Sequence, residues 1–346
     1  MRPREYFDSN EHVDLRVIIR MMEQRMVGRL RRSVSVVGLG TWQLGADWGS
    51  VDSADAEATL DAAIDAGITF FDTADVYGDG LSEQFNGQLL KRAPEIFVAT
   101  KMGRRVEQRT ENYSDQNLLA WNDRSRANLG VDTLDLAQLH CPPDGVYDSD
   151  AVFETLDRMV VEGRMRAYGV SVETCAQALK AIARPHVATV QIILNCFRLK
   201  PLERVLPAAA EAGVGIIARV PLASGMLAGR YDRSTTFAAD DHRSYNRHGE
   251  AFDVGETFSG VPYDVGLEAV EELKRFVDPG VTLAQFALRW IIDQPGVSTV
   301  IPGARNAEQA RGNAAAAALP PLREDQLEGV AGVYDRLIRP HVHDRW

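Results

Sequence analysis

Eight short apolar runs, each followed by a segment of helical periodicity, constrain the fold of this chain more than any other feature. The runs are rich in Val, Ile, Leu and Phe without strict alternation, which is typical of strands buried on both faces. Eight β/α units without an internal linker predict a single (β/α)8 TIM barrel, an α/β fold, rather than a doubly wound sheet. The predicted strands span residues 35–40, 68–73, 96–102, 134–140, 166–172, 189–195, 215–221 and 297–303.

Helix signals between the strands agree with this pattern. Ser53 is the predicted N-cap of the first helix, because its hydroxyl can accept a hydrogen bond from a free amide of the first turn. Gly67 is predicted to end that helix. Further helices are predicted over residues 83–90, 117–129, 151–162, 175–183, 202–212, 283–293 and 307–315.

Three segments fall outside the repeating units. Residues 1–25 are predicted to be an N-terminal extension, and residues 26–346 one barrel domain whose first residues form a solvated, Arg-rich hairpin capping the barrel bottom. A long polar insertion over residues 226–265 follows the seventh strand, and loops of this length are usually functional. Residues 323–346 are predicted to form a last helix and a solvated tail containing His341 and His343.

Composition and charge exclude several classes of partner. The net charge of −11 disfavours binding to nucleic acid or to an anionic membrane, and no apolar run approaches the ~18 residues of a membrane span. Cys141, Cys175 and Cys196 are far apart and lack the spacing of metal ligands, so no metal is expected. Three cysteines suit a reducing compartment, and we expect a cytoplasmic protein. Assembly into homo-oligomers is left open.

Titratable residues end three consecutive predicted strands. Asp72, Lys101 and His140 have no packing reason to stand there, and in a TIM barrel they would converge at the C-terminal mouth. Together with Tyr77 they predict an acid/base site for carbonyl reduction, in which Tyr77 gives a proton to the developing alkoxide. Lys101 is expected to lower the pKa of Tyr77, Asp72 to hold Lys101, and His140 to orient the carbonyl or relay the proton.

Several motifs in order resemble the aldo-keto reductase superfamily, particularly its bacterial and potassium-channel β-subunit branch. The segment 71–78 reads FDTADVYG, and the lysine and histidine follow in ATK at 99–101 and LH at 139–140. GLGTW at 38–42, GVS at 169–171 and VIPGAR at 300–305 extend the likeness over roughly residues 28–340. The resemblance implies an NADPH-dependent oxidoreductase that acts on a small-molecule carbonyl or alcohol, with Tyr77, Lys101, Asp72 and His140 as its catalytic residues.

The same resemblance implies a cofactor extended across the barrel mouth. Thr41 and Asp72 would lie near the nicotinamide ribose, and Ser171 and Gln191 would bind the carboxamide. Arg305 at the start of the last barrel helix suits a 2′-phosphate, so NADP is favoured over NAD. The remaining implied contacts are Pro221, Leu222, Ser224 and Arg230 for the pyrophosphate, and Gly303, Gln309 and Asn313 with Arg305 for the adenosine end.

The substrate pocket is expected to include Trp42, Tyr77 and His140. Its other walls would come from the loop 103–116, the insertion 226–265 and Trp346. These are the parts that a barrel constrains least, so the sequence identifies neither the carbonyl compound nor the physiological direction of the reaction.

The chain also departs from the family pattern at three positions. Val172 stands where Asn is frequent, and Gly312 where Glu is common near the adenine. Arg219 replaces the Tyr or Trp that usually stacks on the nicotinamide, and we include it among the cofactor-binding residues. Its charge is expected to disfavour the oxidised nicotinamide and so ease release of NADP+.

Two other functions remain open. Lys101 could serve as the Schiff-base lysine of an aldolase, although that leaves Arg230 and the segment 303–313 without a role. The chain could also be a nucleotide sensor, as the potassium-channel β subunits are thought to be in part. Those subunits lack the histidine that stands here as His140, which favours turnover.

Overall fold

The computed structural model describes residues 22–45 and 52–346, in which eight parallel strands pair in chain order. The last strand meets the first through bridges between Val37 and Val300 and between Gly40 and Gly303, which close the barrel. The predicted TIM barrel is confirmed. Its strands are β3 (Leu39–Gly40), β4 (Phe70–Asp72), β5 (Phe97–Met102), β6 (Leu136–His140), β7 (Tyr168–Ser171), β8 (Thr189–Ile193), β9 (Gly215–Arg219) and β10 (Val297–Val300).

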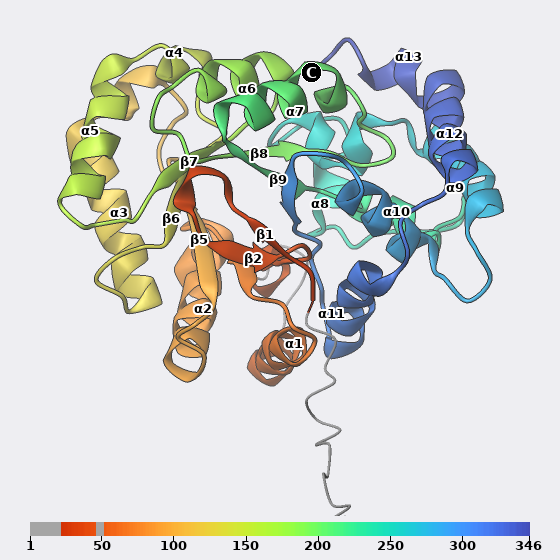
Figure 1. Ribbon diagram of the computed structural model, residues 1–346, viewed down its shortest axis with the longest axis horizontal. Helices are drawn as coiled ribbons and strands as arrows, with labels where there is room; N and C mark the ends of the chain where they lie inside the picture. Colours follow the sequence, from red (N-terminus) through yellow and green to blue (C-terminus); the bar gives the residue numbers. More distant parts are fainter. Residues whose placement is uncertain (1–21, 46–51) are drawn as a thin grey trace, which may run out of the picture.

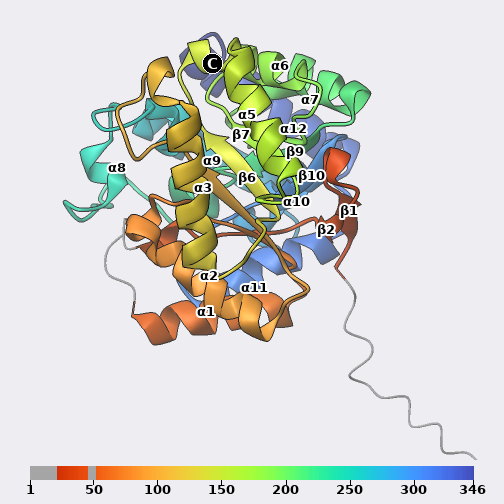
Figure 2. The ribbon, with the colours of Figure 1, turned by 90° about the vertical axis from the view of Figure 1, so that its left-hand side faces the viewer.

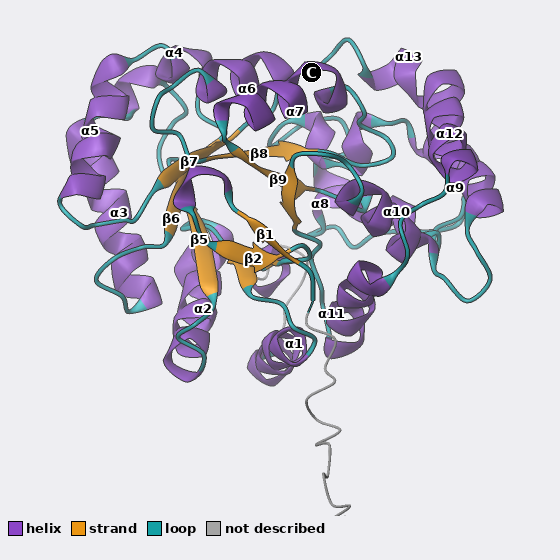
Figure 3. Cartoon of the chain, viewed as in Figure 1, coloured by secondary structure: helices purple, strands orange, loops and turns teal. Residues whose placement is uncertain are grey.

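Helices surround the strands on the outside of the barrel (Figures 1 and 3). Their positions agree with the predicted ranges to within two residues at most ends. None of the helices in the described ranges is long and apolar enough to cross a membrane. The ring consists of α1 (Ser53–Asp65), α2 (Leu81–Arg92), α3 (Asp115–Leu129), α5 (Asp150–Val161), α6 (Cys175–Ile182), α7 (Pro201–Ala212), α10 (Leu283–Ile292) and α11 (Ala307–Ala314), with the short α4 (Asp144–Tyr147) before α5.

The predicted N-cap of α1 is wrong by one residue. Asp52 has an extended backbone, and its carboxylate accepts a hydrogen bond from the Ala54 amide at 2.8 Å. Ser53 is already the first residue of the helix. An N-cap must keep a non-helical conformation for its side chain to reach the free amides, and here Asp52 meets that requirement.

An antiparallel hairpin of β1 (Gln24–Met26) and β2 (Ser33–Ser35) covers the barrel bottom, at the end opposite to α8 (Figure 2). Val27 and Val34 pack into the base of the barrel with Phe70 and Phe97. The predicted cap is therefore present, and the predicted extension 1–25 falls mostly on residues 1–21, outside the described part of the chain. The hairpin arginines are not simply solvated, because Arg29 donates to several carbonyl groups of the neighbouring loops, including that of Ala212 at 2.9 Å.

The insertion after β9 folds into short helical turns over the opposite, C-terminal end of the barrel. Its elements are η5 (Ala223–Ala228), α8 (His242–Tyr245), η6 (Val254–Glu256) and η7 (Phe258–Gly260), after which the chain continues into α9 (Tyr263–Leu273). The Ser224 hydroxyl donates to the Glu256 carbonyl at 2.8 Å, and Asn195 at the end of β8 donates to the Ser259 hydroxyl at 2.8 Å. These bonds attach residues 253–260 to the barrel.

The C-terminal segment is solvated only in part: His341 is exposed, as predicted, whereas Val342 and Trp346 are buried, so the prediction of a wholly solvated tail is wrong. After α12 (Glu324–Val333), a π-helix (Tyr334–Ile338) and α13 (Arg339–Val342), His343 contacts the Tyr334 hydroxyl at 2.8 Å. Trp346 is 7% exposed and donates its indole N–H to the Asp253 carboxylate at 3.0 Å. Its ring lies so close to Gly260 that a Cβ at that glycine would come within 2.4 Å of the indole. Apolar burial and one charged hydrogen bond therefore fix the tail to the 253–260 segment.

The hairpin turn provides a stability test. Gly28 has φ of +46°, and a Cβ there would come within 2.2 Å of the Gly215 amide nitrogen. We expect Gly28→Ala to lower the free energy of unfolding by about 3 kcal/mol, since it combines backbone strain with a steric clash. Gly130→Ala is the matched control, because φ there is +67° but nothing lies within 4 Å, and it should cost about 1 kcal/mol. Equal losses in urea unfolding would contradict the clash with Gly215.

Candidate active site

The C-terminal ends of the strands open into one cavity of about 950 Å³. Every residue predicted to bind the cofactor or to form the substrate pocket lines it, whereas Lys101 lies behind the wall and Trp346 does not reach the cavity. The cavity-lining residues among the predictions are Thr41, Trp42, Asp72, Tyr77, His140, Ser171, Gln191, Arg219, Pro221, Leu222, Ser224, Arg230, Gly303, Arg305, Gln309 and Asn313.

Asp72, Lys101 and Tyr77 form a connected buried group. The Lys101 ammonium makes an ion pair with Asp72 Oδ1, donates to the Thr73 carbonyl at 2.8 Å, and lies 3.3 Å from the Tyr77 hydroxyl. Asp72 ends β4 and Lys101 stands in the neighbouring strand β5, so the parallel pairing of the two strands brings the side chains together. The three donors of the ammonium thus have three oxygen partners.

The charges in this group affect both pKa values. Burial alone would lower the pKa of Lys101, but the Asp72 carboxylate and then Tyr77 outweigh it, so the pKa is raised. Burial raises the pKa of Tyr77, and the Lys101 charge lowers it by less. The net direction for Tyr77 is upward, contrary to the expectation from the sequence, because burial is the largest effect. The structure therefore holds Tyr77 as a phenol, the form that can donate a proton.

The second oxygen of Asp72 anchors two amides. Gln191 Nε2 donates to Asp72 Oδ2 at 2.8 Å and Gln138 Nε2 donates to it at 3.2 Å. The Gln191 side-chain oxygen lies 3.5 Å from the Ser171 hydroxyl, and both residues line the cavity. A carbonyl oxygen and a hydroxyl side by side are suited to pairing with a primary amide.

His140 meets the Tyr77 ring edge-on, with 5.9 Å between ring centroids and 87° between planes. Burial, and then the charges of Arg104, Lys101 and Arg219, hold the pKa of His140 well below its usual range. The imidazole is therefore neutral near pH 7 and can donate one hydrogen bond to an oxygen in the cavity. It is followed by Cys141 at φ of +48°, a strained conformation that turns the chain away from the barrel directly after the histidine.

Trp42 forms an aromatic wall beside the tyrosine. It stacks on Tyr77 with 5.9 Å between centroids and 22° between planes, and it contacts His242 and Phe252 from the insertion. His242 and Phe252 both come from residues 226–265, and Phe252 also lines the cavity, so the insertion forms part of the cavity wall. Trp42 lines the cavity at this position, and its role as a wall of the substrate pocket stays a prediction.

Comparisons with known proteins agree with this geometry. The model of the Aldo/keto reductase family matches residues 36–335. The chain belongs to the aldo/keto reductase family. It is 30% identical over 298 residues to the aldo-keto reductase YhdN of Bacillus subtilis, covering 83% of this chain and 86% of that protein. It is 26% identical to a probable voltage-gated potassium channel subunit beta of Arabidopsis thaliana, and the match covers 87% of this chain and 93% of that protein.

A solved structure is also similar along the whole barrel. The aldo-keto reductase from Klebsiella pneumoniae in complex with NADPH superimposes with a TM-score of 0.66 at 25% identity, covering 90% of this chain and 96% of that one. Membership in the family makes this chain one of the oxidoreductases. It also agrees with the superfamily and the branch that the motifs predict.

The residues of this aldo/keto reductase fit a nicotinamide dinucleotide. Beyond β9 the backbone has positive φ at Val220, Ala223, Ser224 and Gly225, a turn-rich segment of which Val220, Ser224 and Gly225 line the cavity. At the far end α11 begins at the cavity, where Asn306 caps it and Gln309 accepts a hydrogen bond from the Arg305 amide at 2.9 Å. Exposed amides and arginines beside a helix N-terminus are suited to phosphate groups.

Thr41 and Asn313 have structural contacts as well as places in the cavity wall. The Thr41 hydroxyl donates to the Asp72 carbonyl at 2.9 Å, and Asn313 Nδ2 donates to the Gly303 carbonyl at 3.1 Å. Gly312 also lines this end of the cavity, so the common Glu is absent from the wall. Whether these groups touch a nucleotide stays a prediction.

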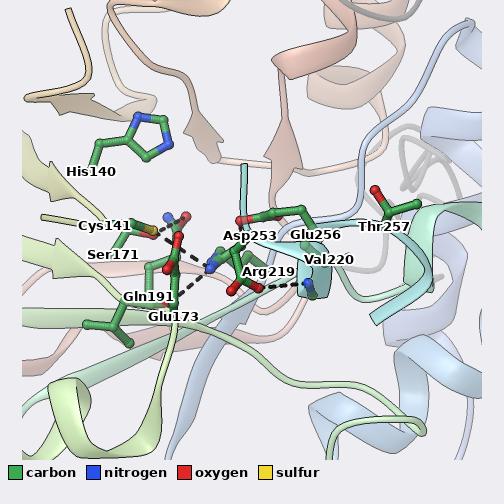
Figure 4. Close-up of polar contacts among 12 residues, drawn as sticks. His140, Cys141, Ser171, Glu173, Gln191, Arg219, Val220, Asp253, Glu256 and Thr257 are labelled. Atoms are coloured by element: carbon green, nitrogen blue, oxygen red, sulfur yellow. Dashed lines mark hydrogen bonds and ion pairs between the residues drawn. The ribbon is translucent and has the colours of Figure 1, made fainter. Parts of the chain in front are cut away.

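Two ion pairs lie beside His140 and the Asp72–Lys101 pair, and their acidic members, Glu256 and Glu173, are not predicted from the sequence. Arg219 forms an ion pair with Glu256, both labelled in Figure 4. Arg219 Nη2 also donates to the Val172 carbonyl at 2.8 Å. Arg104 forms a 3.1 Å ion pair with Glu173 and donates to the His140 carbonyl at 3.2 Å. Glu256 lies in an irregular segment without periodicity, so no sequence pattern indicated its partner.

Asp75 is a buried carboxyl group that the predicted mechanism does not use. Within the described residues, neither of its side-chain oxygens has a hydrogen-bond partner. Burial, and then the charge of the nearby Glu83, raise the pKa of Asp75 to about 7. The neighbouring cations Arg105, Arg124 and Lys101 lower it by less. Asp75 is thus largely protonated in the folded protein below neutral pH.

This raised pKa predicts a pH-dependent loss of stability. The unfolded chain releases the Asp75 proton near pH 4, whereas the folded chain keeps it to about pH 7, so stability falls as the pH rises through that window. As the pH rises from 5 to 8, the free energy of unfolding of Asp75→Asn should therefore increase by roughly 2–3 kcal/mol relative to that of wild type, as measured by urea unfolding. Asp79→Asn, whose side chain is 77% exposed, serves as the control, and its stability relative to wild type should change little over the same pH range because solvent screens the charge. If the difference in unfolding free energy between Asp75→Asn and wild type does not change with pH, Asp75 is not a buried neutral acid.

Proposed function

We propose that this aldo/keto reductase is an NADP-dependent enzyme that reduces an aldehyde or ketone to an alcohol, with Tyr77 as the proton donor. The observation that carries the proposal is the Tyr77 hydroxyl, which lines the cavity 3.3 Å from the Lys101 ammonium and beside the neutral His140. A phenol, a fixed cation and a neutral imidazole are the groups needed to polarise and protonate a carbonyl oxygen.

NADPH, when bound, supplies the hydride. His140 donates a hydrogen bond to the carbonyl oxygen and orients it toward Tyr77. Because its imidazole is neutral, His140 acts here as an orienting donor and not as a proton relay. The Tyr77 phenol gives its proton to the oxygen as negative charge develops there. Lys101, held charged by Asp72, stabilises the phenolate that remains.

Other cavity residues support the choice of NADP. Ser171 and Gln191 offer the donor and acceptor for the carboxamide, and Arg305 beside the start of α11 suits a 2′-phosphate. Thr41, Pro221, Leu222, Ser224, Arg230, Gly303, Gln309 and Asn313 line the remaining path. The similar Klebsiella pneumoniae enzyme was solved in complex with NADPH.

The contacts of Lys101 argue against a Schiff-base aldolase. Its nitrogen is paired with Asp72, Thr73 and Tyr77, and its pKa is raised, whereas a Schiff-base lysine must be a neutral amine with an open path to the substrate. A nucleotide sensor would need no neutral imidazole beside the tyrosine. Wild-type protein that binds NADPH yet consumes none with any compound in a carbonyl panel would favour the sensor.

Replacement of the proton donor tests the proposal. A panel of aldehydes, ketones, quinones and keto-sugars, screened by NADPH depletion, first provides a substrate. Tyr77→Phe should then lower kcat by about 10³-fold, while the Kd for NADPH stays within about twofold, because only the proton is lost. Tyr113→Phe is the matched control, since this buried tyrosine bonds to Gln108 outside the cavity and should keep its activity. Full activity in Tyr77→Phe would rule out this tyrosine as the acid.

A further inference from the structure

Arg219 and Glu256 form a buried ion pair in the wall of the cavity. Arg219 ends β9 and is 7% exposed, and Glu256 reaches it from the insertion (Figure 4). The other Arg219 contacts are the Val172 carbonyl at 2.8 Å and the Cys141 sulfur at 3.8 Å. The guanidinium thus lies at the ends of β6, β7 and β9, next to Ser171 and Gln191.

Glu256 is fixed in place and ionised. Its carbonyl accepts from the Ser224 hydroxyl at 2.8 Å, and Asp253, three residues earlier, is bonded to Trp346. Burial alone would raise the pKa of Glu256, but the charges of Arg219 and Arg104 outweigh it, so the pKa is lowered. Since Glu173 similarly compensates Arg104, the two arginines at this side of the cavity each have an acidic partner.

We propose that Glu256 sets the relative affinity of the site for oxidised and reduced nicotinamide nucleotides by neutralising Arg219. The proposal rests on the proposed function. A nicotinamide ring carries a positive charge only in its oxidised form, so an uncompensated guanidinium nearby opposes NADP+ and not NADPH. With Glu256 paired to Arg219, the site presents little net charge to the ring and accepts both forms.

The ion pair with Glu256 alters the effect on the oxidised cofactor that is expected for Arg219 from the sequence. Alone, the arginine would favour release of NADP+. Paired with Glu256, it keeps the planar guanidinium in the wall while its charge is cancelled. Glu256 is therefore a positioning and specificity-determining residue that acts through Arg219, and the effect of the arginine on the oxidised cofactor depends on an acid from the insertion.

The test compares the Kd values of NADPH and NADP+ by titration calorimetry, without a substrate. Glu256→Gln keeps the size and a hydrogen-bonding oxygen but removes the charge. We expect its Kd for NADP+ to rise about tenfold while that for NADPH changes by no more than about twofold. Glu256→Asp, which restores a carboxylate, should recover at least part of the wild-type ratio. The Glu173→Gln control removes an acid that pairs with Arg104 instead, and its ratio should change by less than about threefold.

The double variant Arg219→Gln, Glu256→Gln separates charge from structure. If Glu256 acts through the arginine, removing both charges should return the ratio of the Kd for NADP+ to the Kd for NADPH to within about threefold of the wild-type ratio. Equal weakening of both nucleotides in Glu256→Gln, or a ratio that stays altered in the double variant, would overturn the inference and leave Glu256 a purely structural residue. A wild-type protein that binds neither nucleotide would instead overturn the proposed function on which the inference rests.

Discussion

The ion pair between Asp72 and Lys101 is the interaction around which the cavity wall is built. Removing two charges from water costs several kcal/mol for each ion, so such a pair persists only where further hydrogen bonds satisfy both groups. Here the Thr73 carbonyl and the Tyr77 hydroxyl are the other hydrogen-bond partners of the ammonium. The side-chain amides of Gln138 and Gln191 donate to the carboxylate. The pair thus links strands β4, β5, β6 and β8 at the depth where Tyr77 enters the cavity.

The barrel strands and the insertion contribute different residues around this cavity. Strand ends supply Asp72, Lys101, His140 and Ser171, whose positions follow from the pairing of parallel strands. The insertion supplies Phe252 and Glu256, held by bonds to the barrel and to the tail. The proton transfer that we propose would therefore depend on the barrel, whereas the surroundings of Arg219 depend on a loop segment outside the sheet.

Sequence reasoning reached those features that depend on local pattern. Buried strands, helix periodicity and the polar residues at strand ends are visible in short windows, and they led to the barrel and to the group of Asp72, Tyr77, Lys101 and His140 at its C-terminal end. The partner of Arg219 was not visible, because Glu256 lies in a segment without periodicity and meets the arginine only through tertiary packing. The direction of the Tyr77 pKa was missed for a similar reason. It depends on how much water the surrounding protein removes, which neighbouring residues in the sequence do not tell.

The contact of Trp346 with residues 253–260 has a consequence for engineering this barrel. Because the indole occupies the space where a Cβ at Gly260 would project, and also holds Asp253, the two segments are complementary in shape and in hydrogen bonding. Grafting a foreign insertion to alter the carbonyl compounds accepted would leave the indole without its glycine and its carboxylate. A chimera that replaces the insertion should therefore also replace the C-terminal segment that ends at Trp346, so that the two are exchanged together.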